Sequence, residues 1–214
     1  MEPIRILCYG DSNTWGYISG TDHKRYGSNE RWTKLLAKKL GDKFEVIEEG
    51  LNGRTLTSND NRINKEGRNG YEYLLPCLDT HNPIDVVIIM LGSNELKAEY
   101  NRTAEQIGEI FEEKFVKTIL YRKIELEHKS PKLIIIAPAE VNEHVEYRSE
   151  EKKFLGAEEK SKKFNSIYKN IAEKNNCYFI SNEELKTGID GLHLTIESHR
   201  RLAELLVEKI KDIF

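Results

Sequence analysis

Four short segments, spread along almost the whole chain, carry the side chains that a serine nucleophile would need. They are Gly10-Asp11-Ser12, Asn52-Gly53, Gly92-Ser93-Asn94 and Asp190-Gly191-Leu192-His193. A serine hydroxyl attacks an acyl carbon only when a base takes its proton, and the attacked carbonyl then needs hydrogen-bond donors for its oxyanion. Because the segments supply a hydroxyl, a base with a carboxylate beside it, and several donors, they point together to nucleophilic acyl chemistry.

The predicted catalytic triad is Ser12, His193 and Asp190. Histidine suits the base because its ordinary pKa lies near neutral pH, and a carboxylate three residues earlier can reach its Nδ1 within one turn. Taken alone, a serine such as Ser12 is more often a helix cap or turn residue, and Asp190-Gly191 is typical of an ordinary turn. The other histidines have no comparable carboxylate partner in a strand-end loop, and His199, inside the last helical pattern, is expected at the surface.

Oxyanion donors are predicted at Ser12, Gly53 and Asn94. Ser12 and Gly53 would offer backbone N–H groups, and Asn94 would offer its side-chain amide. Glycine at position 53 would also let the backbone approach the substrate closely. The alternatives are a simple hairpin turn at Gly53 and a helix cap at Asn94. We also expect Asp11 and Trp15, which flank the nucleophile, to contact the substrate.

Five short apolar runs must position these residues. Such runs are typical of strands covered on both faces, and their alternation with amphipathic stretches predicts a parallel sheet between two helical layers. The runs are Ile4–Tyr9, Phe44–Ile47, Val86–Leu91, Leu133–Ala137 and Tyr178–Ile180. Ser12, Gly53 and Asn94 follow the carboxyl ends of strands, where such sheets carry their functional loops. We therefore predict one α/β domain over residues 1–214, with its site at that edge.

The stretches between the strands have helical periodicity and clear end signals. Helices are predicted over Trp32–Leu40 before Gly41, from the capping box Thr103-Ala104-Glu105-Gln106 onward, over Phe164–Ile171, and over Leu202–Ile210 with Thr195 as cap. Three longer irregular stretches, residues 16–30, 55–70 and 139–149, are expected to shape a pocket.

Composition excludes several classes of protein. Charged residues make up 32% of the chain and the formal net charge is −3, which gives no reason to expect a nucleic-acid partner. No apolar run approaches the roughly 18 residues of a membrane span, and no export signal is apparent. Cys8, Cys77 and Cys177 are odd in number and far apart, so we expect free, buried thiols and a cytoplasmic protein. HExxH and CxxC patterns are absent, so neither metal nor cofactor is expected.

The four segments resemble the sequence blocks of the SGNH (GDSL-type) hydrolases, which contribute Ser, Gly, Asn and His. Ser12, Gly53, Asn94 and His193 match these blocks, and Asp190 matches the acid of the family triad. The likeness narrows to a group of arylesterases and acyltransferases known from mycobacteria, through Gly10–Gly16, Arg31-Trp32, Glu45–Leu51 and Tyr73–His81. One departure is Glu95, where the closest relatives tend to have Asp, and this position lies outside the catalytic set.

This resemblance implies a flavodoxin-like, three-layer α/β/α fold with a five-stranded parallel sheet. It further implies hydrolysis of carboxylic esters of small acyl groups, transfer of the acyl group to alcohols in some relatives, no metal, and a homo-oligomer. The partner would be a small-molecule ester, with no role for a membrane.

Three other readings stay open at this point. A carbohydrate acetylesterase of the same fold would use Trp15, Tyr17 and Tyr26 to stack on a sugar ring, although these aromatic residues suit a pocket wall or core equally well. A flavodoxin-type cofactor-binding protein would cradle a phosphate with Ser12 and Thr14, but it leaves Asp190 and His193 without a use. A non-catalytic descendant of an enzyme need not retain every catalytic residue type.

Overall fold

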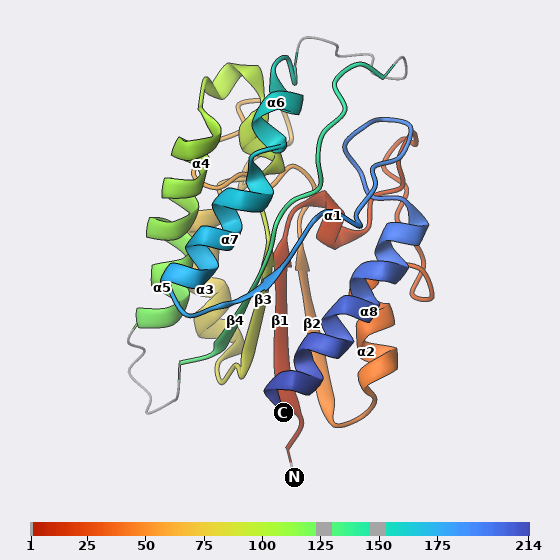
Figure 1. Ribbon diagram of the computed structural model, residues 1–214, viewed down its shortest axis with the longest axis vertical. Coiled ribbons are helices and arrows are strands. Elements are labelled where there is room, and N and C mark those ends of the chain that lie inside the picture. The colour runs from red at the N-terminus through yellow and green to blue at the C-terminus, as the bar shows by residue number, and fades with distance from the viewer. Residues whose placement is uncertain (1, 123–129, 146–152) are drawn as a thin grey trace.

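A five-stranded parallel sheet forms the centre of the computed structural model, which describes residues 2–122, 130–145 and 153–214 (Figure 1). The strand order is β2-β1-β3-β4-β5, and all neighbouring pairs are parallel. The strands are β1 (Ile4–Gly10), β2 (Phe44–Gly50), β3 (Val86–Met90), β4 (Lys132–Ile136) and β5 (Tyr178–Ile180). The five predicted strands and the fold class are confirmed, with β2 running on to Gly50.

Helices cover both faces of the sheet (Figure 1). One layer holds α2 (Trp32–Leu40) and α8 (Ile196–Ile213). The other holds α3 (Gly70–His81), the stretch α4 (Ala104–Ile110), η3 (Phe111–Val116) and α5 (Lys117–Tyr121), then α6 (Ala157–Ser161) and α7 (Phe164–Lys174). The capping box at Thr103 and Gln106 and the cap at Thr195 form as predicted.

Alternate residues of the central strands feed two separate cores, because successive side chains of a strand point to opposite faces. Leu7 and Val87 pack into the layer with α3, α4 and α7. Their neighbours Ile6 and Ile88 pack under α2 and α8. The sheet is therefore held from both sides, and the loops at its carboxyl ends rise from a rigid base.

β2 is covered less completely than the central strands, although its side chains pack into both cores, Ile47 on one face and Phe44 and Val46 on the other. This strand lies at the edge of the sheet, and its residues are half-buried or exposed. Acidic side chains alternate toward the two helical layers there. Burial alone would raise the pKa of Glu48, but hydrogen bonds from Arg31 and Thr33 hold it at about 2.

The three cysteines are free, as predicted, with Cys8 and Cys77 buried and Cys177 partly buried. Among the described residues, no helix has both the length and the apolar character needed to cross a bilayer.

His199 is fully buried, so its predicted surface position is wrong. It lies where α8 packs on α2, and its Nδ1 accepts the backbone N–H of Trp32 at 3.2 Å. Trp32 is the first residue of α2, and the preceding Arg31 provides no side-chain cap. His199 thus satisfies a helix-start donor from a distant helix. Burial lowers the pKa of His199 to about 3, which keeps the imidazole neutral.

Because His199 is neutral in the folded protein, we expect the free energy of unfolding to fall in acid. Unfolded His199 would titrate near pH 6.5, whereas the folded form stays neutral down to about pH 3. The unfolded chain then binds the extra proton below pH 6.5, so stability falls as the pH drops through that window. Between pH 8 and pH 5, wild type should lose about 2 kcal/mol more unfolding free energy than His199→Asn, whose amide oxygen can still accept the Trp32 N–H. Urea unfolding at both pH values measures this difference, and equal losses would contradict it.

Candidate active site

Ser12 opens a single-turn helix, α1 (Ser12–Trp15), directly after β1. The helix lies so close to the strand ends that a Cβ on Gly50 would come within 2.2 Å of the Trp15 nitrogen. A Cβ on Gly10 would come within 2.1 Å of the Thr14 Oγ1 in α1 and within 2.6 Å of the Met90 carbonyl oxygen. These two glycines let α1 sit on the ends of β1, β2 and β3. The nucleophile candidate is therefore fixed to the sheet itself.

A continuous line of hydrogen bonds joins Ser12, His193 and Asp190. The Ser12 Oγ lies 2.9 Å from His193 Nε2, and His193 Nδ1 lies 2.7 Å from Asp190 Oδ2. We assign the Nδ1–H tautomer, since Nδ1 faces a carboxylate, so that Nε2 accepts the serine hydroxyl. Burial alone would raise the pKa of Asp190, but hydrogen bonds from His193 and from the Leu192 and His193 backbone N–H groups hold it well below its usual range. The carboxylate stays charged beside the imidazole.

Asn13 couples the two halves of this line. Its Oδ1 accepts the Leu194 N–H at 2.9 Å, and its Nδ2 donates to the Leu192 carbonyl at 3.2 Å. These two bonds hold the His193 loop against α1, although the segments are far apart in sequence. This role of Asn13 was not predicted from the sequence, where its place next to Ser12 is the only hint.

The loop over residues 16–30 packs against His193 and Asp190, as expected for a stretch that helps to form the pocket. The Tyr17 ring stacks on the His193 imidazole with centroids 4.1 Å apart and planes inclined by 22°. Ser19 Oγ accepts the Asp190 N–H at 3.0 Å, and Gly20 N–H donates to Asp190 Oδ2 at 3.3 Å. Tyr17 thus forms part of the wall around the imidazole, which is one of the two roles suggested for it from the sequence.

Asn94 lies in a short 3-10 helix, η1 (Ser93–Leu96), just beyond β3. Gly92 occupies the N-cap position, so the alternative that Asn94 caps a helix is wrong. The Asn94 Nδ2 donates to the Arg54 carbonyl at 3.1 Å. That bond uses one of the two amide hydrogens and fixes the plane in which the second one points.

Gly53 lies in the turn after β2, with a φ of +79° that favours glycine. The hairpin alternative is wrong, because β2 pairs only in parallel with β1 and no antiparallel strand follows this turn in the described part of the chain.

Arg54 connects the ends of β1 and β2 with Asn94, a role that was not predicted from the sequence. The side chain is 2% exposed, and its Nη1 donates to the Gly10 carbonyl at 2.9 Å and to the Glu49 carbonyl. Its guanidinium lies 4.1 Å from the ring centroid of Tyr9 and 5.1 Å from that of Tyr73. The carbonyl of the same residue holds Asn94. No sequence pattern marks this role, because an arginine after a turn is usually a surface residue.

Glu95 is fully buried and joins the loop after Gly53 to η1. Its Oε1 accepts the Leu56 and Thr57 N–H groups at 2.6 and 3.1 Å, and its Oε2 accepts Ser58 Oγ and Arg102 Nη1. Glu95 was expected outside the catalytic set, and it touches no triad residue, but it connects the loop after Gly53 to the helix that carries Asn94.

Asp11 and Trp15 were predicted to contact substrate, and both contacts stay predictions. Asp11 is 1% exposed, and its Oδ1 accepts the Asn13 N–H at 2.9 Å, which caps α1. Burial raises the pKa of Asp11 to about 6. Trp15 keeps a partly exposed ring, with the Arg25 guanidinium 5.0 Å from its centroid. Tyr26, the third suggested sugar-stacking residue, packs edge-on against His199.

The other two predicted pocket loops differ in how far they are described. The stretch over residues 55–70 holds Glu95 through Leu56 and Thr57. In the third stretch, the Asn142 N–H donates to the Gly191 carbonyl at 2.9 Å, so it borders the His193 loop. Residues 146–149 of that stretch lie outside the described residues.

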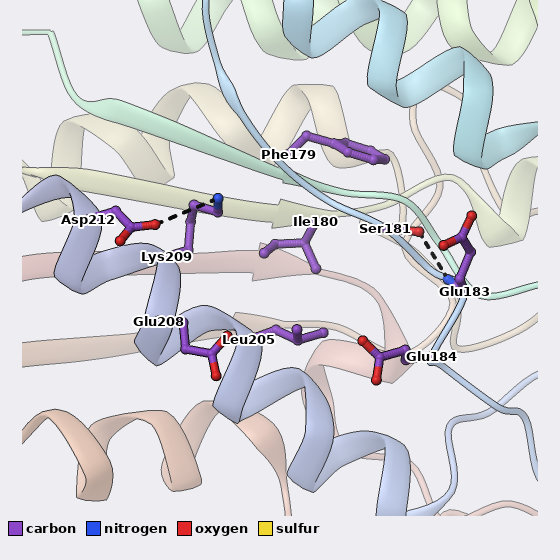
Figure 2. A pocket seen from close by; sticks show the side chains of 9 residues that line it. All are labelled: Phe179, Ile180, Ser181, Glu183, Glu184, Leu205, Glu208, Lys209 and Asp212. Atoms are coloured by element: carbon purple, nitrogen blue, oxygen red, sulfur yellow. Dashed lines mark hydrogen bonds and ion pairs between the residues drawn. The ribbon is translucent and has the colours of Figure 1, made fainter.

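A separate pocket lies between β5 and α8 (Figure 2). Its lining residues are Phe179, Ile180, Ser181, Glu183, Glu184, Leu205, Glu208, Lys209 and Asp212. These include none of the residues in the hydrogen-bonded line to Ser12, so this pocket is distinct from the candidate active site.

Comparisons with known proteins place this chain in a family of ester hydrolases. The model of the GDSL-like lipase/acylhydrolase family matches residues 8–201. A carbohydrate acetylesterase from Sinorhizobium meliloti is similar over 99% of this chain and 100% of its own, with 34% identity and a TM-score of 0.91. The aryl esterase of M. smegmatis is similar over the same shares, with 33% identity and a TM-score of 0.90.

A lipase/acylhydrolase from Enterococcus faecalis shares the fold, with 20% identity, a TM-score of 0.66 and coverage of 98% of this chain and 96% of its own. No curated protein matches the chain. Because the family model spans most of the sequence and two esterases of similar sequence cover it almost completely, the chain belongs to the GDSL-like lipase/acylhydrolase family and is a carboxylic ester hydrolase close to the arylesterases.

Proposed function

We propose that this esterase forms an acyl-serine intermediate at Ser12. The observation that carries the proposal is the unbroken hydrogen-bonded line from Ser12 Oγ through His193 to Asp190. His193 Nε2 takes the hydroxyl proton as Oγ attacks the ester carbonyl, and the charged Asp190 stabilises the imidazolium. His193 then gives the proton to the leaving alcohol. Water repeats the sequence on the acyl-enzyme and releases the acid.

The oxyanion is stabilised by the backbone N–H groups of Ser12 and Gly53 and by the second amide hydrogen of Asn94. Support comes from the positions of these groups at adjacent strand ends and from the bond between Asn94 and the Arg54 carbonyl. Donors held in place before the reaction cost no reorganisation when the charge develops. Each of these steps is complete without a metal ion or a cofactor.

The substrate proposed here is a small-molecule ester with a short acyl group. Deacetylation of a sugar is the second candidate, favoured by the likeness to the S. meliloti carbohydrate acetylesterase. Acyl transfer to an alcohol would use the same acyl-enzyme, with the alcohol in place of water. The three free thiols support a cytoplasmic location, and we propose that the enzyme acts there as a homo-oligomer.

The Ser12→Ala variant should lose ester hydrolysis by several orders of magnitude, because triad members act as a unit. Its fold should be intact, since the side chain shrinks by one hydroxyl. Mass spectrometry after treatment with a serine-directed phosphonate should show one covalent adduct on wild type and none on Ser12→Ala. Ser93→Ala is a matched control, a buried serine at the next strand end, and should still be labelled. An adduct on another serine would overturn the assignment.

Asn94→Ala should lower kcat by roughly 10²–10³ with KM nearly unchanged, the usual effect of losing one oxyanion donor. Asn94→Asp should be at least as harmful, because a carboxylate would repel the developing negative charge. Steady-state kinetics on a chromogenic acetate ester, with circular dichroism to check folding, measure both effects. If Asn94→Asp retains wild-type kcat, the donor at this position has been misassigned.

A panel of p-nitrophenyl esters of increasing acyl length should show kcat/KM falling beyond the shortest acyl groups. Access to the nucleophile is narrow, since Ser12 is only 6% exposed, and short acyl groups are what the resemblance to the arylesterases implies. An acetylated monosaccharide measured beside p-nitrophenyl acetate separates the two substrate candidates. Highest efficiency with an octanoate ester would contradict the short-acyl proposal.

A further inference from the structure

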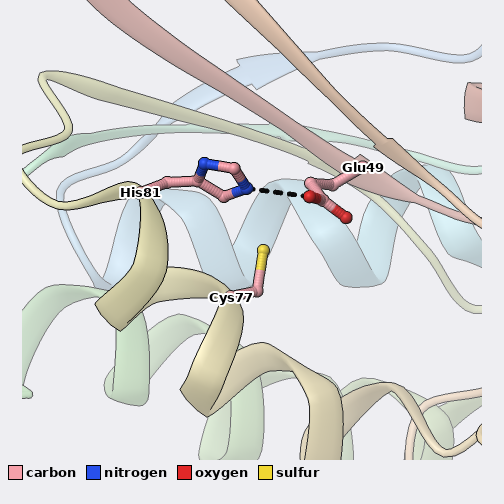
Figure 3. Close-up of side chains that lie close together, drawn as sticks. All are labelled: Glu49, Cys77 and His81. Carbon is pink, nitrogen blue, oxygen red and sulfur yellow. Dashed lines mark hydrogen bonds and ion pairs between the residues drawn. The ribbon is translucent and has the colours of Figure 1, made fainter.

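A second group of chemically active side chains lies away from Ser12, where the edge strand β2 meets α3. Cys77 and His81 are one helical turn apart on α3, and Glu49 comes from the end of β2 (Figure 3). Side chains at i and i+4 project from the same face of a helix. Their ligand atoms, the Cys77 Sγ, one ring nitrogen of His81 and a Glu49 carboxylate oxygen, all lie within 4.8 Å of one another.

The three side chains point toward one common point, as metal ligands do, and they are not arranged as a second catalytic triad would be. In a triad, the imidazole uses one nitrogen toward the nucleophile and the other toward the carboxylate. Here the His81 Nε2 lies 2.8 Å from Glu49 Oε1, and the same side of the ring faces the Cys77 thiol (Figure 3). All three ligand atoms therefore converge on one point.

Burial also distinguishes this group from an ordinary surface ion pair. Cys77 is only 2% exposed, and no hydrogen bond of its thiol is found within residues 2–122, 130–145 and 153–214. The side chains of His81 and Glu49 are 23% and 18% exposed, which leaves a way in from solvent. The Tyr73 hydroxyl donates to Glu49 Oε2 at 3.0 Å and orients the carboxylate from behind, as second-layer partners of metal ligands do.

We propose that Glu49, Cys77 and His81 form a Zn²⁺ site with a water molecule as fourth ligand. Thiolate, imidazole and carboxylate are the ligands that zinc takes in tetrahedral sites. With bonds of about 2.0–2.3 Å, ligand atoms in such a site lie roughly 3.4–3.7 Å apart. Side-chain rotations that move the ligand atoms by about 1 Å would bring them from within 4.8 Å of one another to that spacing.

Charge and proton balance are consistent with binding. Zn²⁺ displaces the thiol proton to solvent, so that a Zn–S bond forms as the S–H bond breaks, and it replaces the hydrogen bond between His81 and Glu49. Burial, with the Glu49 carboxylate adding to it, raises the pKa of Cys77 to about 12, while the Arg54 charge lowers it. Once the thiol proton has left, the Cys77 thiolate and the Glu49 carboxylate together balance the two positive charges of the bound ion. The site would fasten the edge strand to α3, and it contributes no residue to the proposed hydrolysis.

Cobalt(II) tests this proposal, because a Co²⁺–thiolate bond gives a charge-transfer absorption in the near ultraviolet that other ligands do not. Full-length protein without a polyhistidine tag should bind one Co²⁺ with that absorption, and Zn²⁺ should abolish it by displacement. Cys77→Ser should remove the absorption. His81→Gln should weaken Co²⁺ binding by more than the roughly 10–100-fold that loss of an outer-layer partner costs.

Cys177→Ser is the matched control, because Cys177 is a partly buried thiol outside the cluster, and it should bind Co²⁺ like wild type. Zn²⁺ should also raise the melting temperature of wild type and of Cys177→Ser but not that of Cys77→Ser, provided that circular dichroism shows each variant folded. No thiolate absorption with wild type, or an absorption that survives in folded Cys77→Ser, would overturn the proposal. Neither readout depends on esterase activity, so the two proposals fail separately.

Discussion

One buried cation, Arg54, underlies the arrangement of the whole active-site edge. Its guanidinium donates to carbonyls at the ends of β1 and β2 and lies against the rings of Tyr9 and Tyr73. A buried charge is costly unless it is compensated, and here two strand-end carbonyls accept from Nη1 and two aromatic faces lie against the guanidinium, while the buried Nε has no hydrogen-bond partner among the described residues. Because the carbonyl of the same residue holds Asn94, the first two strands and the η1 turn cannot shift independently.

Above this base, the hydrogen-bonded line connects residues from opposite ends of the chain. Ser12 and His193 are 181 positions apart, and their contact depends on the sheet bringing the β1 end and the loop after β5 to one edge. Asn13 then sets the local register through two backbone groups of the His193 loop. The Tyr17 ring stacks on the His193 imidazole and covers one of its faces. The entropic cost of ordering these catalytic groups is met when the protein folds, so little further ordering is needed when the substrate reacts.

The strands, the helices α2, α4, α7 and α8, and the positions of the four motif segments could be predicted, because apolar periodicity and end signals are local properties of the sequence. The helix α3 was not predicted. His199, Arg54 and Glu95 could not be interpreted in the same way. Each is a polar residue buried by a partner distant in sequence: His199 by α2, Arg54 by the ends of β1 and β2, and Glu95 by the loop that follows Gly53. Local patterns assign such residues to the surface, and only the tertiary contacts reveal their partners.

The end of β2 shows how one edge strand serves three structural tasks with three successive residues. Glu48 points to the α2 layer, where Arg31 holds it, and Glu49 points to the α3 layer, where it meets His81. Gly50 leaves the space in which α1 and its nucleophile sit. The alternation of side chains along a strand makes this separation possible, since neighbouring residues face opposite layers. Binding or loss of a metal ion at Glu49, Cys77 and His81 would therefore affect the contact between β2 and α3. The position of Ser12 depends instead on the packing of the α1 backbone against Gly50.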